Sequence, residues 1–234
     1  MDMNVPRRDG KSPDEVCYFM GHYVPWRRTR LKAIVRHFGR GWFRDKRILE
    51  LGCGYGHMGI SLAYLGANVT FSDARQKHLD NLAEFWPTVP DEQLICANLE
   101  REWPFKGHWD LILHQGLLYH LTNWQFGLEK AVKCCDHMAL ECETLDAANP
   151  SATKIQLENE ERMHSSIDGK SERVPAARIE TELAKVGFKF KLCLDERLNT
   201  TRHNYTWKPR NNKLSTAMQR RWWWCWTGGN DGPS

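Results

Sequence analysis

Acidic side chains and glycines occur at spacings that suit a nucleoside-binding site. Glu50 closes an apolar segment and precedes a loop with Gly52, Gly54 and Gly56. Glycines let the backbone approach a ligand where any Cβ would collide. Asp73 follows at about the twenty-residue interval where an acidic side chain meets ribose hydroxyls in nucleotide-binding βαβ units. We therefore expect these five residues to hold a nucleoside-like ligand.

Two cofactor classes compete for this loop. Gly54, Gly56 and Gly59 also satisfy the G-x-G-x-x-G spacing of a dinucleotide fold, which seats a pyrophosphate at the start of the following helix. A carboxylate at Glu50 would repel a pyrophosphate, but it would attract an ammonium group. The interpretation that we favour is a cofactor with an amino acid at this end.

The pattern E-x-G-x-G-x-G at residues 50–56 resembles the first motif of the class I S-adenosylmethionine (SAM) methyltransferases. The resemblance implies SAM as the cofactor, with the loop around its methionine part and Asp73 on its ribose. It also places Asn98 and Leu99 near the adenine, and Asn98 is the better candidate for the adenine amino group. Each carboxylate also has a structural alternative, since Glu50 could accept local backbone amides and Asp73 could cap a helix.

The segment after the fourth predicted strand carries the catalytic candidates His114, Tyr119 and His120. Histidine has a suitable ordinary pKa for removing a proton from an acceptor hydroxyl. We expect His114 near the cofactor and His120 near the acceptor, although a histidine after a buried strand is often only structural. The segment lacks the aspartate or asparagine, two prolines and aromatic of N-methyltransferases, which disfavours amino groups of DNA bases.

Aromatic and basic residues precede the first strand. In the family that the motif resembles, such a segment often closes over the methionine end of the cofactor, with an arginine forming a bidentate fork on its carboxylate. Tyr23, Trp26 and Arg27 are the candidates. The alternative is that the aromatics only pack the first helix.

The elements that must position these residues alternate along the chain. Strands are predicted at 48–50, 67–72, 93–97, 109–113, 138–145, 189–194 and 203–207, and helices at 28–37, 57–65, 76–85, 124–134 and 175–186. This alternation predicts an α/β fold with a parallel sheet. The resemblance implies a seven-stranded, mostly parallel, doubly wound sheet whose last two strands form an antiparallel hairpin at one edge. Ligands of such sheets bind at the carboxyl ends of the strands.

The length of the chain suits one domain, which we assign to residues 1–227. We expect residues 1–45 to form its N-terminal cap and helix, and residues 228–234 to form a disordered tail. The polar stretch 146–175 is too long for an ordinary connection, so we expect a substrate lid. Its polar candidates are Asn159, Glu160, Arg162 and His164. A solvated insertion without catalytic interest is the alternative.

Composition limits the environment and the partners. The eight cysteines contain no C-x-x-C pair, so we expect reduced thiols, and the histidines do not join them at zinc spacing, so no metal site is expected. No apolar run is long enough to cross a bilayer, and the N-terminus lacks a secretory core. The sequence therefore predicts a cytoplasmic protein without a membrane partner.

A basic, tryptophan-rich segment lies near the C-terminus, at Arg220–Trp226. Such a segment could stack on unpaired bases, finish a strand, pack against a sheet edge, stack on sugars or mediate dimerisation. The net charge of +4 is too small to require a polyanion. Nucleic acid is thus possible as a partner but not required.

These observations predict a SAM-dependent methyltransferase that acts on a small-molecule or glycan acceptor. A second resemblance is to the transferases that alkylate the tRNA wobble uridine with carboxy-SAM. It rests on the WRRTR segment at 26–30, the GLLYHL segment at 116–121 and the ETL segment at 143–145. That resemblance implies an RNA-modifying (carboxy)methyltransferase as the alternative. A SAM-binding protein without transfer activity is the third hypothesis.

Overall fold

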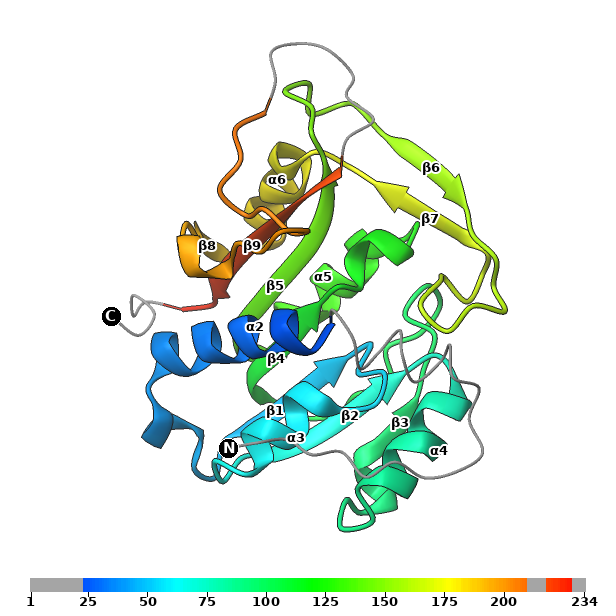
Figure 1. Cartoon of the computed structure of the whole chain (residues 1–234), viewed down its shortest axis with the longest axis vertical. Coiled ribbons are helices and arrows are strands. Elements are labelled where there is room, and N and C mark those ends of the chain that lie inside the picture. Colours follow the sequence, from blue (N-terminus) through cyan, green and yellow to red (C-terminus); the bar gives the residue numbers. More distant parts are fainter. Residues whose placement is uncertain (1–22, 210–217, 229–234) are drawn as a thin grey trace.

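The structure, a computed structural model, describes residues 23–209 and 218–228. Its main sheet has seven strands in the order β3-β2-β1-β4-β5-β9-β8 (Figure 1). The strands are β1 (Arg47–Leu51), β2 (Asn68–Asp73), β3 (Leu94–Cys96), β4 (Trp109–Gln115), β5 (Cys135–Leu145), β8 (Lys189–Leu192) and β9 (Met218–Trp226). Strands β1 to β5 pair in parallel, and β9 is antiparallel to both of its neighbours. The predicted fold class is confirmed.

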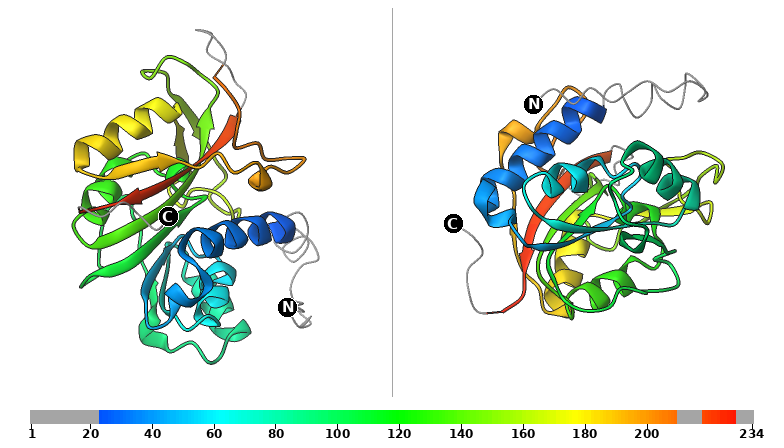
Figure 2. Two further views of the ribbon diagram at one scale, coloured as in Figure 1. Left: turned by 90° about the vertical axis from the view of Figure 1, so that its left-hand side faces the viewer. Right: turned by 90° about the horizontal axis from the view of Figure 1, so that it is seen from below.

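Helices cover both faces of the sheet, as Figure 2 shows. The helices are α2 (Tyr23–Phe38), α3 (His57–Ala63), α4 (Gln76–Phe85), α5 (Trp124–Ala131) and α6 (Ala176–Val186). On one face, α2, α3 and α4 bury Ile34, Leu62 and Leu82 in one hydrophobic cluster. On the other face, α5 and α6 bury Leu128 and Leu183 in a second cluster. The sheet is therefore doubly wound.

The strands are apolar along their length because both of their faces are buried. In β1, Ile48 belongs to the cluster under α2, α3 and α4, whereas Leu49 belongs to the cluster under α5 and α6. Successive side chains of a strand point to opposite faces of the sheet. Because helices cover both faces, both sets of side chains are apolar, and the strand shows no alternation of polar and apolar residues. Glu50 interrupts this apolar run, which marks it for a function other than packing.

The prediction of a strand at 203–207 is wrong. In the connection that contains these residues, a side chain and not a neighbouring strand binds the backbone. Asn199 Oδ1 accepts a hydrogen bond from the Tyr205 backbone N–H at 2.8 Å, and Asn199 Nδ2 donates to Thr206 Oγ1 at 3.0 Å. Such local bonds compete with strand pairing. The last strand is instead β9, which lies between β5 and β8. The expected antiparallel pair at one edge of the sheet is therefore present, but β9 and not residues 203–207 pairs with β8.

Of the roles that the sequence allowed for the tryptophan-rich segment at Arg220–Trp226, the structure supports strand formation, because the segment lies in β9. Trp222 and Trp223 are fully buried, on opposite faces of the sheet. A buried indole has no face for an unpaired base, which removes the main argument that the sequence offered for nucleic acid.

The long polar connection after β5 contains a second, two-stranded sheet. Its strands β6 (Lys154–Leu157) and β7 (Lys170–Arg173) pair antiparallel, and the loop between them returns toward the ends of β2 and β3 (Figure 1).

Of the predicted N-terminal cap and disordered tail, residues 1–22 and 229–234 lie outside the described residues. Within the described residues, no helix is long and apolar enough to cross a membrane.

Candidate active site

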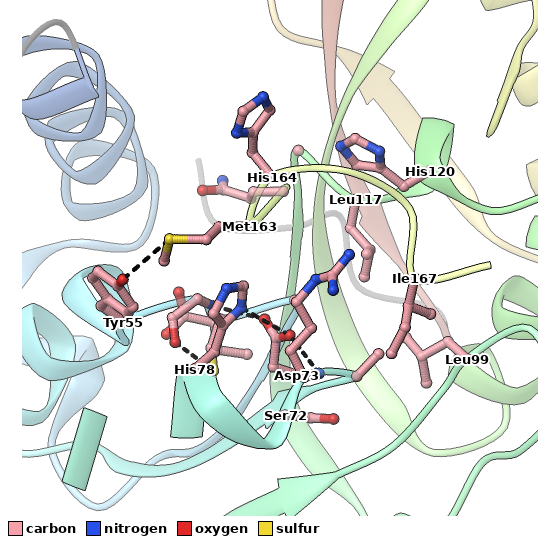
Figure 3. A pocket seen from close by; sticks show the side chains of 18 of the residues that line it. Tyr55, Ser72, Asp73, His78, Leu99, Leu117, His120, Met163, His164 and Ile167 are labelled. Atoms are coloured by element: carbon pink, nitrogen blue, oxygen red, sulfur yellow. Dashed lines mark hydrogen bonds and ion pairs between the residues drawn. The ribbon is translucent and has the colours of Figure 1, made fainter. Parts of the chain in front are cut away.

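A cavity opens at the carboxyl ends of β1, β2 and β4. Its walls come from the glycine loop, the ends of β2 and β3, the segment after β4, the first turns of α2 and the loop between β6 and β7. In Figure 3, Met163, His164 and Ile167 of that last loop lie across the cavity from Asp73 and His78. This is the crevice where open α/β sheets bind their ligands.

The glycines of the loop serve two different purposes. Gly52, Gly54 and Gly56 have φ angles of 62°, 54° and 70°, in the left-handed region that favours glycine. A Cβ on Gly54 would meet nothing within 4 Å, so this backbone faces the open space of the cavity. A Cβ on Gly59, in contrast, would lie 2.5 Å from Glu50 Oε2. Gly59 therefore leaves the room that the Glu50 carboxyl and the β2 side chains Phe71 and Val69 occupy.

The Glu50 carboxyl is engaged through one of its two oxygens. Its Oε2 accepts a hydrogen bond from the Gly59 backbone at 2.8 Å, and no described residue donates to Oε1. Burial raises the pKa of Glu50 to about 8, against the lowering effects of the Gly59 bond, Arg30 and Arg27. The structural alternative for Glu50, acceptance of a local backbone amide, therefore applies to Oε2. Oε1 accepts no such bond from a described residue, and Glu50 lines the cavity. An ammonium group fits that oxygen.

Asp73 ends β2 with a nearly saturated carboxylate. Oδ1 accepts the Arg75 backbone N–H at 3.0 Å and lies 3.0 Å from His78 Nδ1, while Oδ2 accepts the Gly54 backbone N–H at 2.9 Å. Burial raises its pKa, but the bonds from His78, Arg75 and Gly54 outweigh burial and lower the pKa. An ionised carboxylate offers about four acceptor positions. One position on Oδ2 is left, which suits a single ribose hydroxyl.

Leu99, Leu117 and Ile167 supply apolar walls beyond Asp73 (Figure 3). Asn98 also lines the cavity, but its amide is engaged, since Nδ2 donates to the Asp168 carboxylate at 3.2 Å and Oδ1 accepts from the Glu100 backbone at 3.0 Å. Asn98 Nδ2 also contacts the second oxygen of Asp168, at 3.3 Å. Asp168, whose partner role no sequence pattern indicated, joins the loop between β6 and β7 to this wall.

His114 lies outside the cavity lining, contrary to the position that we expected for it near the cofactor. β4 extends two residues beyond the predicted strand, and His114 becomes an interior strand residue opposite Leu51 and Leu140. Its side chain is buried, and neither ring nitrogen has a hydrogen-bond partner in another described residue. Burial lowers the pKa of His114 to about 4, so the imidazole is neutral.

His120 and Tyr119 do line the cavity. His120 Nδ1 lies 3.0 Å from Glu158 Oε2, at the end of β6. Burial raises the pKa of Glu158, but hydrogen bonds from His120, Ser171 and the Ser166 backbone outweigh burial and keep the pKa well below its ordinary range. The ionised carboxylate favours the tautomer with hydrogen on Nδ1. No described residue is hydrogen-bonded to Nε2, which leaves that nitrogen as a base.

The predicted candidates on α2 also meet at the cavity, because Tyr23, Trp26 and Arg27 lie within one turn of the helix. Trp26 Nε1 donates to the Tyr205 hydroxyl at 2.6 Å, which ties α2 to the connection before β9. Arg30 was not among the predicted site residues, although it follows Arg27 by three residues and Trp26 by four, a spacing that places it on the same helix face.

The loop between β6 and β7 covers the cavity from above. Tyr55 Oη donates to Met163 Sδ at 3.7 Å, and Arg75 Nη2 donates to the Ser165 carbonyl at 3.1 Å. Among the polar residues expected there, His164 lines the cavity, whereas Asn159, Glu160 and Arg162 do not. In the described part of the chain, no group of three or more His, Cys, Asp or Glu side chains is arranged to hold a metal ion.

Comparisons with known proteins agree with this geometry. The family model described as methyltransferase domain matches residues 22–191. No curated protein sequence matches the chain. Among solved structures, the N-terminal domain of EvdMO1, crystallised in the presence of S-adenosylhomocysteine (SAH) and D-fucose, is 19% identical with a TM-score of 0.65, and the match covers 89% of this chain and 84% of that one.

Two further structures come from named bacteria. A SAM-dependent methyltransferase from Clostridium acetobutylicum is 13% identical with a TM-score of 0.58, over 92% of this chain and 96% of that one. A TehB-like SAM-dependent methyltransferase from Corynebacterium glutamicum is 13% identical with a TM-score of 0.57, over 92% and 94%. The glycine loop, the two acidic strand ends and the family match lead to one conclusion: the chain belongs to the methyltransferase domain family and is a SAM-dependent class I methyltransferase.

Proposed function

We propose that this methyltransferase acts on a hydroxyl group of a small molecule or glycan. The observation that carries the proposal is the His120–Glu158 pair, at 3.0 Å, in the wall of the cavity. Bound SAM supplies a methyl group on a positively charged sulfur, which is an excellent leaving group. What the protein must add is alignment of the acceptor and, for a hydroxyl, a base.

His120 is the base in this proposal. Glu158 accepts the hydrogen of Nδ1, so Nε2 keeps its lone pair and can take the proton of the acceptor hydroxyl. Glu158 acts through His120 as a positioning residue, and Arg173 Nη1, 2.9 Å from Glu158 Oε1, fixes that carboxylate. Tyr119 accepts a hydrogen bond from Arg220 at 3.1 Å, and burial raises its pKa, so its hydroxyl stays protonated and can donate to the acceptor.

For holding the cofactor we propose Glu50 for the ammonium group, Arg27 for the carboxylate and Asp73 for the ribose. Around them we propose supporting contacts from the backbone of Gly52, Gly54 and Gly56, from Tyr23 and Trp26, and from Asn98 and Leu99 beside the adenine. His114 is not retained, since its side chain is absent from the lining of the cavity.

A sugar is one form of acceptor that we propose, and a structural relative motivates it. The N-terminal domain of EvdMO1, to which this chain is similar in fold, was crystallised with D-fucose. The RNA-modifying alternative has lost its stacking argument with the burial of Trp222 and Trp223.

Incubation with methyl-labelled SAM and fractionated extract of the native cells tests the proposal. We expect label in a small-molecule or glycan fraction. His120→Gln should lower kcat by about 10² to 10⁴, the usual contribution of a general base, while the affinity for SAH stays unchanged. Glu158→Gln should lower kcat less and shift the pH profile of kcat.

Three results would contradict the proposal. Label in the RNA fraction would favour the RNA-modifying alternative, and a steep salt dependence of tRNA binding would support it. Full activity of His120→Gln would remove the assigned base. SAH binding without transfer to any fraction would favour a SAM-binding protein that has no transfer activity.

A further inference from the structure

Arg30 of α2 is a buried cation that lines the cavity, and the proposed reaction assigns it no role. Its side chain is only 7% exposed and it lines the cavity. The guanidinium lies over Trp26, with 3.9 Å between Cζ and the centre of the ring. A guanidinium stacked on an indole is held flat before any ligand arrives.

The charge around Arg30 is unbalanced. Glu141 of β5 is fully buried and is shared by two arginines, with Arg220 Nη1 at 2.9 Å from Oε1 and Arg30 Nη1 at 3.5 Å from Oε2. The Tyr205 hydroxyl donates to Oε1 as well, at 3.1 Å. Two cations therefore face one carboxylate, and Arg220 has the shorter contact. Buried charges need partners, so a second anion would stabilise this cluster.

The donors of the two arginines are used differently. Arg220 donates from both terminal nitrogens, to Glu141 and to the Tyr119 hydroxyl. Arg30 has only the long contact with Glu141, and its buried Nε has no hydrogen-bond partner among the described residues. A preorganised fork of N–H groups beside the cavity is thus left with unused donors, and such a fork matches carboxylate or phosphate oxygens.

The position of Arg30 assigns this anion to the acceptor side. A Cβ on Gly116, the residue after β4, would lie 3.9 Å from Arg30 Nη1 and 3.9 Å from Glu141 Oε2. Arg30 is therefore beside the ends of β4 and β5, near Tyr119. Asp73, to which we assign the ribose of the cofactor, belongs to β2, two strands away from β4 in the sheet. Gln115 also lines the cavity here, and its buried amide nitrogen and oxygen have no partner in the described part of the chain.

We propose that Arg30 binds an anionic oxygen group, a carboxylate or phosphate, carried by the methyl acceptor, with Gln115 beside it as a neutral polar contact. This inference rests on the proposed function and narrows its acceptor to an acidic small molecule or acidic sugar. The other source of a carboxylate is the methionine part of the cofactor. Burial raises the pKa of Glu50 while Arg27 and Arg30 both lower it, so their effect on Glu50 does not separate the two arginines. We assign the cofactor carboxylate to Arg27, because the guanidinium of Arg30 is directed to Glu141 and lies beside Gly116 at the end of β4.

Small anions test the site without knowledge of the acceptor. Protein saturated with SAH is titrated with [¹³C]acetate and with inorganic phosphate, and binding is read from NMR relaxation of the anions. We expect saturable binding that Arg30→Gln weakens at least ~tenfold, the effect of losing charge-assisted hydrogen bonds. Arg28→Gln, an exposed arginine of the same helix, is the matched control and should leave binding unchanged.

Controls separate Arg30 from the cofactor and from folding. SAH and 5′-methylthioadenosine, which lacks the amino acid part, are titrated into Arg30→Gln and Arg27→Gln. We expect Arg27→Gln to lose affinity for SAH only, and Arg30→Gln to keep wild-type affinity for both, which also shows that it is folded. A loss of SAH affinity alone in Arg30→Gln would assign Arg30 to the cofactor and overturn the inference, as would anion binding that Arg30→Gln does not change. Arg30→Lys keeps the charge and should retain part of the anion binding.

The acceptor itself gives an independent result. Cell extract is separated on an anion exchanger before it reacts with methyl-labelled SAM, so the charge of the acceptor and not of the product is read. We expect label in the retained fractions. Label only in the unretained fraction would overturn the inference and leave the proposed function intact. Label in no fraction would contradict the proposed function, and the anion titration then decides the inference by itself.

Discussion

At the scale of single residues, Glu50 shows how one carboxyl group can organise both the protein and its ligand. Oε2 holds the first turn of α3 through the Gly59 backbone, and burial keeps the proton on the group until a cation arrives. An ionised carboxylate facing an empty cavity would be costly, and the raised pKa avoids that cost. Binding of an ammonium group and loss of this proton are therefore coupled.

This coupling gives a pH dependence with a definite sign. Because the pKa of Glu50 is about 8 in the free protein, the carboxyl is protonated below pH 8 and must release a proton to pair with an ammonium group. We expect SAH affinity to rise with pH between about 6 and 8, with proton release measured by titration calorimetry in buffers of different ionisation enthalpy. Glu50→Gln should abolish this release. The affinity for 5′-methylthioadenosine should not depend on pH, and an equal dependence would contradict the assignment.

The same pKa shift affects the unliganded protein. The unfolded chain ionises Glu50 near pH 4.5, whereas the folded chain keeps the proton to about pH 8. The contribution of this group therefore destabilises the fold progressively as the pH rises through that range. Glu50→Gln should gain stability relative to the wild type as the pH rises, which urea unfolding at several pH values can measure.

At the scale of secondary-structure elements, the sequence predicts the strands and turns whose formation depends on residues close together in the chain. The first four strands were predicted because each is a short apolar run that ends at or just before a polar residue: Glu50, Asp73, Asn98 and His114. The strand β9 was missed because consecutive tryptophans lack a strand period, and they are buried only through partners that are distant in sequence. The alternation in 203–207 resembled a strand, but Asn199 satisfies that backbone locally.

The site was predictable to the same extent. Glu50, Asp73 and the glycines follow from a short motif, and the structure brings them to one cavity. Glu158 could not be selected, because its partner His120 is 38 residues away. The helix face of Arg30 could be identified from its spacing to Trp26 and Arg27, but its contact with Glu141, 111 residues away, could not. His114 was misplaced by the extension of β4, which turned a loop residue into a core residue.

The start of α3 offers a test with a matched control. Gly59→Ala puts a methyl group 2.5 Å from Glu50 Oε2 and from Phe71 Cε1, so we expect a loss of about 1 to 3 kcal/mol from overpacking and a loss of SAH affinity. Gly127→Ala, in α5, meets nothing within 4 Å and should stabilise the fold by up to about 1 kcal/mol. Urea unfolding measures both, and equal effects would contradict the role given to Gly59.

The loop between β6 and β7 is expected to retain the cofactor. Asp168 joins this loop to Asn98 and to Arg101, at 3.2 and 2.8 Å, so Asp168→Ala should increase the dissociation rate of SAH about two- to tenfold, the equivalent of about one hydrogen bond of 0.5 to 1.5 kcal/mol. Stopped-flow fluorescence measures this rate. Glu160→Ala, exposed on the same loop, is the control, and an unchanged rate in Asp168→Ala would show that the loop does not act as a lid.

At the scale of the whole molecule, β9 joins the two hydrophobic clusters and completes the active site. Trp222 packs under α2, α3 and α4, Trp223 packs under α5 and α6, and Arg220 reaches Glu141 and Tyr119. One strand near the end of the chain thus connects both helical layers to the acceptor end of the cavity.

This role gives a large expected effect on stability. Trp222→Ala and Trp223→Ala should each cost about 3 to 5 kcal/mol, the usual result of emptying a tryptophan site in a core. Tyr64→Ala is the control, because Tyr64 is 68% exposed and should change the free energy of unfolding by less than about 0.5 kcal/mol. Denaturant unfolding followed by tryptophan fluorescence and circular dichroism measures these values. Small costs at both tryptophans would mean that β9 is not part of the cooperative core.

The place of β9 also has a consequence for biosynthesis. Its residues are made after those of β8, yet it lies between β5 and β8, so β8 has no neighbour in the sheet until the ribosome has delivered residues 218–226. A nascent chain that stalls earlier lacks both the strand that closes the sheet and the arginine that pairs with Glu141. The sheet can therefore close, and the acceptor end of the cavity can form, only after residues 218–226 have been made.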